Sequence, residues 1–514
     1  MKKTKEIWEF GDFQTPDKLA LQVTSVLQNL NIDAESIIEP TCGKGSLLIT
    51  VAKSYPRAQR YFGADINGNY LNELRSSLRR EELDTDIELM HTDFFDTNWN
   101  QILADTPEPI LIIGNPPWVT SSELSALQSS NVPDKSNFQG RTGMDALTGK
   151  SNFDISEWML LQYLKWLEDK DGTIAVLCKT LVARRILAHL WKHNIKSVFA
   201  HIYKIDAKMH FNASVDACLF VVRLGGGRIL DECNIYEHIN AKANFTKIGY
   251  RNNSVLSDVV SYDLYSHIIS DERNYIWRSG LKHDCSKVME LTRNEHSYIN
   301  GNNDIVSLED DFIYPLLKSS DIANGKIYER RKYVVVTQKY VGEDTNTIKQ
   351  VAPMTWHYLE SNKDFFANRA SSIYKNRPIY SIFGIGDYSF APWKIAISGF
   401  YKRLNFVLVP PIDDKPVMFD DTVYFLPCSS EKEGLFILKL LNSDLAAKVL
   451  NALIFWEDKR PITIDVLKRI NLQALAYELE VEEAFLDLVK FRGLPSYTTQ
   501  TTQLKMFEKR PAYQ

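Results

Sequence analysis

The tetrapeptide Asn115-Pro116-Pro117-Trp118 combines groups that could hold an amine for chemistry. Two consecutive prolines fix φ and remove two backbone donors, so the carbonyl of Pro116 is left as an acceptor beside the amide oxygen of Asn115. Trp118 adds a planar stacking face. Two acceptors and one flat face suit an exocyclic amine on a heterocycle, because hydrogen bonds to both amine protons expose the nitrogen lone pair. Methyl transfer to that nitrogen would then need mainly proximity and orientation. The alternative is a proline-rich turn with a core tryptophan.

A glycine-containing turn precedes it in the chain, with the sequence Glu39-Pro40-Thr41-Cys42-Gly43-Lys44-Gly45-Ser46. Glycines between a strand and a helix let the backbone turn sharply and approach a ligand closely. The spacing does not match a phosphate-binding P-loop, because no Ser or Thr follows the lysine in the required frame. A plain strand-to-helix turn is the alternative.

Two acidic residues follow the next predicted strands. Asp65, followed by Ile66, lies about twenty positions beyond the glycine turn, where a carboxylate suits the two hydroxyls of a ribose. Asp93 is placed to accept from an adenine amino group, with Phe94 packed on the purine ring. The alternatives are a helix cap for Asp65 and a loop acid beside a core aromatic for Asp93.

Strand and helix signals alternate from about residue 16 to 224, which predicts a doubly wound, Rossmann-like α/β sheet. The apolar run 110–114 is typical of a strand buried on both faces of a parallel sheet. Helices are expected over 16–30, from about 46, over 70–80 and, as a strongly amphipathic helix, over 153–167. Strands are expected over 36–39, 60–65, 87–91, 110–114, 173–178, 198–203 and 217–224, with a glycine turn at 225–227.

The second half of the chain has another pattern. The segment 237–257 is polar and rich in asparagine, and we interpret it as a connection. From about residue 276 short strands and turns dominate, which indicates a mixed α+β domain. We predict a domain at 1–245, a connection at 246–275, a second domain at 276–494 and a fraying tail at 495–514. The second domain is expected to hold strands over 333–337, 379–383, 394–398 and 422–426 and helices over 431–454 and 464–479.

Composition limits the possible classes. The chain has 514 residues, more than one hydrophobic core usually serves, and is 44% hydrophobic and 24% charged, as in globular proteins. It has no apolar run long enough to span a membrane and no signal-peptide core, so we expect a cytoplasmic protein. The six cysteines are scattered, which predicts free thiols and no metal site. The net charge of −5 mildly opposes a DNA partner and requires any positive surface to be local.

In order and spacing, the motifs over about residues 8–224 resemble those of gamma-class N6-adenine DNA methyltransferases of restriction-modification systems, type II-like. Residues 11–16, Gly-Asp-Phe-Gln-Thr-Pro, are similar to the family segment that contacts the methionine part of the cofactor, and 210–217 to the segment whose aromatic packs on the extruded base. The resemblance implies S-adenosylmethionine as cofactor and an adenine flipped out of double-stranded DNA. Trp118 departs from the commoner Tyr or Phe.

The resemblance also implies roles for individual residues. The implied catalytic residues are Asn115, Pro116, Pro117, Trp118 and Phe211. The implied cofactor-binding residues are Thr15, Pro16, Glu39, Pro40, Cys42, Gly43, Gly45, Asp65, Ile66, Asp93, Phe94 and Asn115.

The region 276–430 resembles the target-recognition half of such enzymes, most clearly at 277–284 and 382–394. Basic residues interleaved with aromatics suit phosphate contacts and base-edge reading. No nuclease motif stands on a recognisable strand, so a separate restriction endonuclease is the only nuclease partner we consider. The DNA-binding candidates are Arg330, Arg331, Lys332, Lys339, Arg377 and Lys394, and the same interleaving includes Arg369, Lys375 and Lys402.

Two other functions stay open. Similar sites methylate N4 of cytosine or a glutamine amide in release factors, although the large second domain disfavours a protein substrate. The chain could instead be a DNA-specificity module without catalysis. That function is opposed by the intact Gly43, Gly45, Asp65, Asp93 and Asn115.

Overall fold

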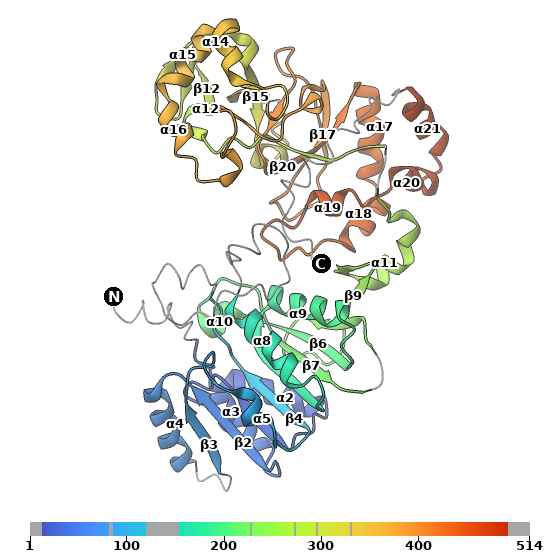
Figure 1. Ribbon diagram of the computed structural model, residues 1–514. Coiled ribbons are helices and arrows are strands. Elements are labelled where there is room, and N and C mark those ends of the chain that lie inside the picture. The colour runs from blue at the N-terminus through green and yellow to red at the C-terminus, as the bar shows by residue number, and fades with distance from the viewer. Residues whose placement is uncertain are drawn as a thin grey trace. The chain divides into compact units, whose positions relative to one another are not determined.

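A computed structural model describes residues 13–81, 86–119, 154–226, 229–271, 274–294, 297–328 and 331–491 (Figure 1). The chain divides into two compact units, the first running to Val259 and the second beginning at Val260. Among these residues, no helix combines the length and the apolar character needed to cross a membrane. The predicted tail, Arg330 and the first residues of the 11–16 motif, Gly11 and Asp12, lie outside the described residues.

The first unit is built on a ten-stranded sheet with the order β10-β9-β8-β6-β7-β5-β4-β1-β2-β3. Strands β5, β4, β1, β2 and β3 are parallel, and β7 runs antiparallel between β5 and β6. The predicted α/β sheet is therefore confirmed. The strands are β1 (Ser36–Glu39), β2 (Arg60–Asp65), β3 (Ile87–His91), β4 (Ile110–Gly114), β5 (Gly172–Lys179), β6 (Ser197–Ile205), β7 (Ala217–Leu224), β8 (Glu232–Tyr236), β9 (Phe245–Arg251) and β10 (Ser254–Leu256).

Burial along these strands follows their place in the sheet. Every residue of β4 is buried, because β1 and β5 flank it and α3 packs against it, whereas the edge strand β3 is partly exposed. Helix α4 lies against β2 and β3, and α9 against β5, β6 and β7 (Figure 1). The helices are α2 (Asp17–Asn29), α3 (Ser46–Ser54), α4 (Gly68–Arg80), α5 (Trp99–Leu103), α8 (Ile155–Trp166), α9 (Thr180–Lys192) and α10 (Ala207–Phe211).

Two predictions for this unit were wrong. Helix α8 is not strongly amphipathic: between Ile155 and Trp166 only Lys165 is exposed, and the helix packs against both α5 and α9. The segment 237–257 is not a connection, because β9 and β10 extend the sheet there. Its asparagines form a hairpin turn: Asn252 and Asn253 both have positive φ, 50° and 59°, as a two-residue turn between antiparallel strands requires.

The second unit contains a four-stranded sheet, β11-β20-β17-β18, and a six-stranded sheet, β14-β13-β12-β16-β15-β19. The strands are β11 (Arg278–Ser279), β12 (Glu290–Asn294), β13 (Ser297–Asn300), β14 (Ile305–Val306), β15 (Ile313–Leu317), β16 (Lys332–Val335), β17 (Trp393–Ser398), β18 (Val407–Val409), β19 (Met418–Phe419) and β20 (Val423–Cys428). The helices are α11 (Val259–Tyr265), α12 (Ser286–Met289), α13 (Ser319–Ala323), α14 (Ile348–Val351), α15 (Pro353–Ser361), α16 (Lys363–Ala367), α17 (Glu431–Leu441), α18 (Asp444–Asn451), α19 (Ile464–Leu467), α20 (Leu472–Glu478) and α21 (Glu482–Phe491).

Three element predictions in the second unit fail for local reasons. The expected helix 431–454 is two helices, because Ser443 starts α18 by accepting from the backbone N–H of Ala446. The expected helix 464–479 is likewise divided, because Asn471 caps α20. Residues 379–383 are not a strand: the Arg369 guanidinium donates to the carbonyls of Ile379 and Ser381, so these acceptors are not used in a ladder.

The segments 277–284 and 382–394 meet inside the second unit. The backbones of Lys282 and Phe383 exchange two hydrogen bonds, both 2.9 Å. A Cβ atom on Gly384 would lie 2.3 Å from the carbonyl oxygen of Gly280, and one on Gly280 would lie 2.1 Å from that of Asp420. The two glycines therefore allow backbones to approach where no side chain fits.

Candidate active site

The segments that follow β1, β2, β3 and β4 meet at one edge of the sheet, because parallel strands end on the same side. Glu39 pairs with Gly63 at the end of β1, and Asp65 with His91 at the end of β2. The backbone N–H of Cys42 donates to the carbonyl of Ala64 at 2.8 Å. The sheet thus brings the glycine turn and the acidic residues predicted from the sequence close together.

The glycine turn has the backbone conformation that its composition suggested. Gly43 and Gly45 both have positive φ, 51° and 80°, and Gly45 leads directly into α3. A Cβ atom on Gly45 would lie 2.3 Å from Leu74 Cδ1 of α4. The turn therefore packs tightly on the neighbouring helix.

Asp65 supports this turn. Its Oδ2 accepts from the backbone N–H of Gly43 and its Oδ1 from that of Asn67, both at 2.8 Å. The helix-cap alternative for Asp65 does not hold, because Asn67 caps α4 with its own side chain. Asp65 is half-buried, and a carboxylate oxygen accepts more than one hydrogen bond, so it retains capacity for hydroxyl donors.

Glu39 and Thr41 present buried oxygen atoms. Among the described residues, neither Glu39 Oε2 nor Thr41 Oγ1 has a hydrogen-bond partner. Burial raises the pKa of Glu39 well above its usual value, although a backbone hydrogen bond from Leu48 opposes this, and nearby Asp65 raises it further. Burial and these two acids also raise the pKa of the Cys42 thiol. A ligand with a hydrogen-bond donor would supply the hydrogen bonds that these buried oxygen atoms lack.

The expected role of the Phe94 ring is not supported by its surroundings. Asp93 lies at the edge as expected and accepts from the backbone N–H of Phe95 at 2.8 Å. Phe94 is only 6% exposed, and its ring packs against Trp99 and Trp166 with centroids 5.3 and 5.6 Å away. The adjacent Phe95 is half-buried, so its ring is less enclosed than that of Phe94.

Asn115 lies directly after β4 and is held by the start of the described chain. Its Nδ2 donates to the carbonyl of Phe13 at 2.7 Å and to Thr15 Oγ1 at 3.3 Å. Its Oδ1 is buried and has no hydrogen-bond partner among the described residues. Leaving such an acceptor unpaired costs about 1–3 kcal/mol, so the position is one that a ligand donor would stabilise.

The rings of Trp118 and Phe211 contact each other and leave no gap between parallel faces. Their rings meet edge to face, with centroids 5.0 Å apart and planes at 74°. A base stacked between two rings would separate them by roughly 7 Å, twice the spacing of stacked bases. Trp118 is 5% exposed, its indole N–H donates to the Leu177 carbonyl, and the Phe13 ring packs on it at 5.7 Å. The two rings therefore contact each other directly here, and the stacking of an adenine between them stays a prediction.

Gln14 and Lys179 also lie at this edge, although no role was predicted for either from the sequence. Gln14 Oε1 accepts from the backbone N–H of Lys44 at 2.9 Å, so the segment 13–15 touches both the glycine turn and Asn115. The 11–16 motif contained this signal, although nothing indicated its partners. Lys179, at the end of β5, pairs with the buried Asp154 at 2.7 Å. No local pattern points to that ion pair.

The DNA-binding candidates of the second unit divide by exposure. Arg331, Lys332, Lys339 and Arg377 are exposed, and Lys332 lies 3.5 Å from Glu290. Lys394 is 1% exposed, so its predicted DNA contact is wrong. Its ammonium donates to the carbonyls of Ala391 and Val417 inside the unit.

Arg369 also has an internal role rather than one in base reading. Its guanidinium donates to the carbonyls of His283, Ser381 and Ile379 and lies 3.5 Å from the centroid of the Tyr374 ring. These contacts use its donors to hold loops together.

We expect the buried Lys394 to make stability pH-dependent. Burial lowers its pKa from 10.5 to about 7, so between these pH values the folded state binds fewer protons than the unfolded state. The free energy of unfolding of the wild type should therefore rise, relative to Lys394→Met, as pH increases through this interval, and the difference should be constant below it. Urea unfolding of both proteins on either side of pH 7 measures this. A difference that does not vary with pH would contradict the expectation.

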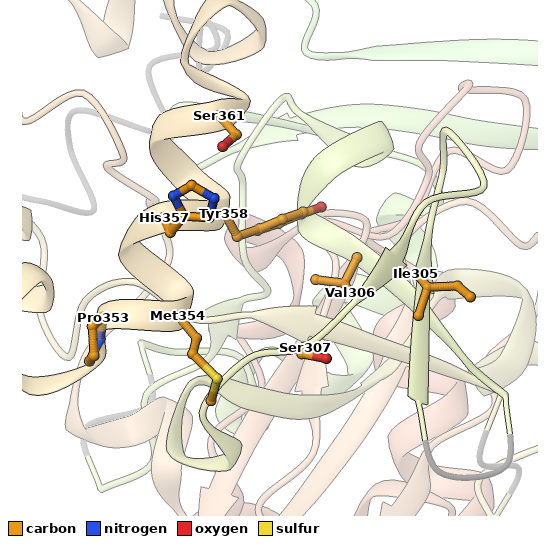
Figure 2. A pocket seen from close by; sticks show the side chains of 8 residues that line it. All are labelled: Ile305, Val306, Ser307, Pro353, Met354, His357, Tyr358 and Ser361. Carbon is orange, nitrogen blue, oxygen red and sulfur yellow. The ribbon is translucent and has the colours of Figure 1, made fainter.

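A groove of about 500 Å³ lies in the second unit (Figure 2). Met354, His357 and Tyr358 of α15 face Ile305 and Val306 of β14 across it. It contains none of the predicted site residues, all of which except the DNA-binding candidates lie in the first unit.

Comparisons with known proteins agree with this geometry. The family model described as N-6 DNA Methylase matches residues 3–270. The type II methyltransferase M.NspV from a Nostoc species is 42% identical over 479 residues, covering 93% of this chain and 98% of that protein. The solved structure of the type IIL restriction-modification enzyme MmeI in complex with DNA is similar in fold, with a TM-score of 0.53 and 14% identity over 96% of this chain and 70% of that one.

Proposed function

Since the chain belongs to the N-6 DNA methylase family, we propose that it transfers a methyl group from S-adenosylmethionine to N6 of a flipped adenine at a specific site in duplex DNA. It is the modification methyltransferase of a restriction-modification system, as its similarity to a type II methyltransferase over nearly the whole chain supports. The observation that supports the chemistry most directly is the buried Asn115 Oδ1, which has no partner among the described residues.

The residues at the sheet edge fit the cofactor. Glu39 Oε2 and Thr41 Oγ1 are buried acceptors without partners in the described part of the chain, and they suit the amino group of its methionine part. Asp65, beside the glycine turn, suits the ribose hydroxyls, and Asp93 the adenine amine. When bound, the cofactor supplies an activated methyl group on a sulfonium. The chain itself has to bind and orient the two reactants, and N6 gives up one of its two protons to water when it takes the methyl group.

Asn115 and Pro116 hold the target amine. Asn115 Oδ1 and the Pro116 carbonyl each accept from one proton of N6, which turns the nitrogen lone pair away from the ring. Both acceptors sit in a largely buried segment, where hydrogen bonds are stronger than in water. Fixed acceptors at this place reduce the reorganisation needed during transfer.

The aromatic rings must rearrange when the base enters. Phe13 and Phe211 are half-buried and pack on Trp118, whereas Trp118 is fixed by its hydrogen bond to Leu177. We therefore assign Trp118 as the stationary face on which the adenine stacks, and Phe13 and Phe211 as the rings that turn aside. Extrusion of the base from the duplex makes such contacts accessible.

The second unit is assigned to DNA recognition. Its exposed Arg331, Lys339 and Arg377 are suited to phosphate contacts, which position the duplex without reading its sequence. Binding by such contacts weakens as salt is raised. The counterpart that we propose is a separate restriction endonuclease that cuts the same DNA sequence when it is unmethylated.

The product of the reaction tests the function. We expect the purified chain, incubated with duplex DNA and labelled S-adenosylmethionine, to place the label in N6-methyladenine at one short sequence. The measurement is digestion of the DNA to nucleosides followed by chromatography, with sequencing of modified bases to locate the site. Label in N4-methylcytosine, or no label in DNA at all, would contradict the proposal.

A further inference from the structure

We propose that Thr15 is a positioning residue: with the Phe13 carbonyl, it fixes which way the Asn115 amide faces, so that Oδ1 and not the amide nitrogen meets the target amine. This inference rests on the proposed function, because it refines the role of Asn115 in the same site. It gives Thr15 a task at the acceptor side, separate from the cofactor contact that the sequence motif implies.

The hydrogen bonds determine the amide orientation without ambiguity. A backbone carbonyl can only accept, so the Asn115 atom 2.7 Å from the Phe13 oxygen must be Nδ2. The Thr15 hydroxyl lies 3.3 Å from the same nitrogen and takes its second hydrogen. Both N–H groups are thereby engaged on one side, and Oδ1 is left on the other.

Orientation matters because an asparagine amide is easily reversed. The terminal torsion of asparagine has a broad, roughly two-fold preference, so nitrogen and oxygen exchange places at little intrinsic cost. In the reversed state, an NH2 group would point at the NH2 of the substrate, and two donors would face each other. The Phe13 carbonyl, which can only accept, selects against that state, and the Thr15 hydroxyl strengthens the selected state by accepting from the same amide nitrogen.

The segment that carries these contacts is itself held at both sides. Gln14 accepts from the backbone N–H of Lys44 in the glycine turn. Pro16 caps α2, and its carbonyl accepts from the backbone N–H groups of Leu19 and Ala20. Helix α2 in turn packs on α3. Thr15 therefore lies between two anchored neighbours, which is what a positioning role requires.

The Thr15 hydroxyl remains able to donate a hydrogen bond of its own. It accepts from Asn115, and a hydroxyl has one proton to give besides its acceptor lone pairs. Contact with a cofactor and orientation of Asn115 are therefore compatible but separable. Loss of a cofactor contact would weaken cofactor binding, whereas loss of Asn115 orientation would slow methyl transfer.

Thr15→Val tests this, because valine keeps the shape and removes the hydroxyl. We expect the single-turnover rate of methyl transfer to fall roughly tenfold, since the Phe13 carbonyl still holds the amide in part. The Kd for DNA should stay within about twofold of wild type, and any loss of calorimetric affinity for S-adenosylmethionine should be smaller than the loss of rate. Thr15→Ser should restore the rate to within about threefold, because it returns the hydroxyl.

A matched control and a double variant make the result specific. Thr24→Val removes a hydroxyl that donates to the Ala20 carbonyl within α2, and it should leave the rate unchanged. In an Asn115→Ala background, Thr15→Val should cause no further loss, because the amide it orients is gone. An undiminished rate in Thr15→Val, a loss appearing only in cofactor affinity, or an additive double variant would overturn the inference. Absence of methylated adenine with the wild type would instead reject the proposed function.

Discussion

Methyl transfer by the Asn115→Ala variant is expected to fall by roughly 10²- to 10³-fold, the usual cost of removing one fixed group that stabilises a reacting centre. The variant loses the one buried side-chain acceptor, Oδ1, assigned to the target amine. Its cofactor affinity should be nearly unchanged, because the glycine turn and Asp65 contact each other independently of Asn115. The measurement is a single-turnover assay with labelled cofactor, paired with calorimetry of cofactor binding.

A second asparagine in the same unit serves as the control. Asn29→Ala changes an exposed side chain at the end of α2 that donates to the Ser25 hydroxyl, so it should methylate at the wild-type rate. Normal methylation by Asn115→Ala would remove Asn115 from the mechanism. If the variant loses cofactor binding as well as activity, Asn115 maintains the structure of this edge of the sheet and does not act on the target amine.

The second large effect concerns stability. Gly384→Ala is expected to lower the free energy of unfolding of the second unit by about 3 kcal/mol or more. The new Cβ would lie 2.3 Å from the carbonyl oxygen of Gly280, and neither backbone can move without breaking the paired hydrogen bonds between Lys282 and Phe383. The backbone φ of +70° adds a smaller cost for any L side chain. Urea unfolding followed by tryptophan fluorescence reports the change.

Gly325 allows the two causes to be separated. It has nearly the same φ, +67°, but a Cβ atom there would have no neighbour within 4 Å. Gly325→Ala should therefore cost only about 1–2 kcal/mol, the price of the left-handed conformation. If both variants lose the same free energy of unfolding, the left-handed backbone conformation, and not the close approach of Gly280, accounts for the cost at Gly384.

The features predicted correctly from the sequence are those that depend on residues close together along the chain. The apolar run of β4 and the proline pair after it are neighbours, so their joint placement at a strand end follows from local rules. The proximity of the glycine turn and Asp65 could also be predicted, because neighbouring parallel strands end at the same edge of the sheet. The order of motifs then fixes much of the first unit.

The features missed depend on what lies across a sheet. Lys394 looked like a surface cation, but β17 lies between β18 and β20, which buries it. The asparagines before residue 257 looked like a linker, but they turn a hairpin at the edge of the large sheet. The packing of Phe94 against aromatic residues of α8 was likewise not indicated by the sequence, and its contact with the cofactor stays a prediction. None of these partners is adjacent in sequence.

The bond from Asn115 to the Phe13 carbonyl joins residues 102 positions apart. During synthesis on the ribosome, Phe13 emerges long before Asn115, and closing so long a loop is entropically costly until the intervening strands have assembled. A nascent or truncated chain can thus carry the whole tetrapeptide and still have a freely rotating amide. We therefore expect the Asn115 amide to take its fixed orientation only after the strands between Phe13 and Asn115 have assembled into the sheet.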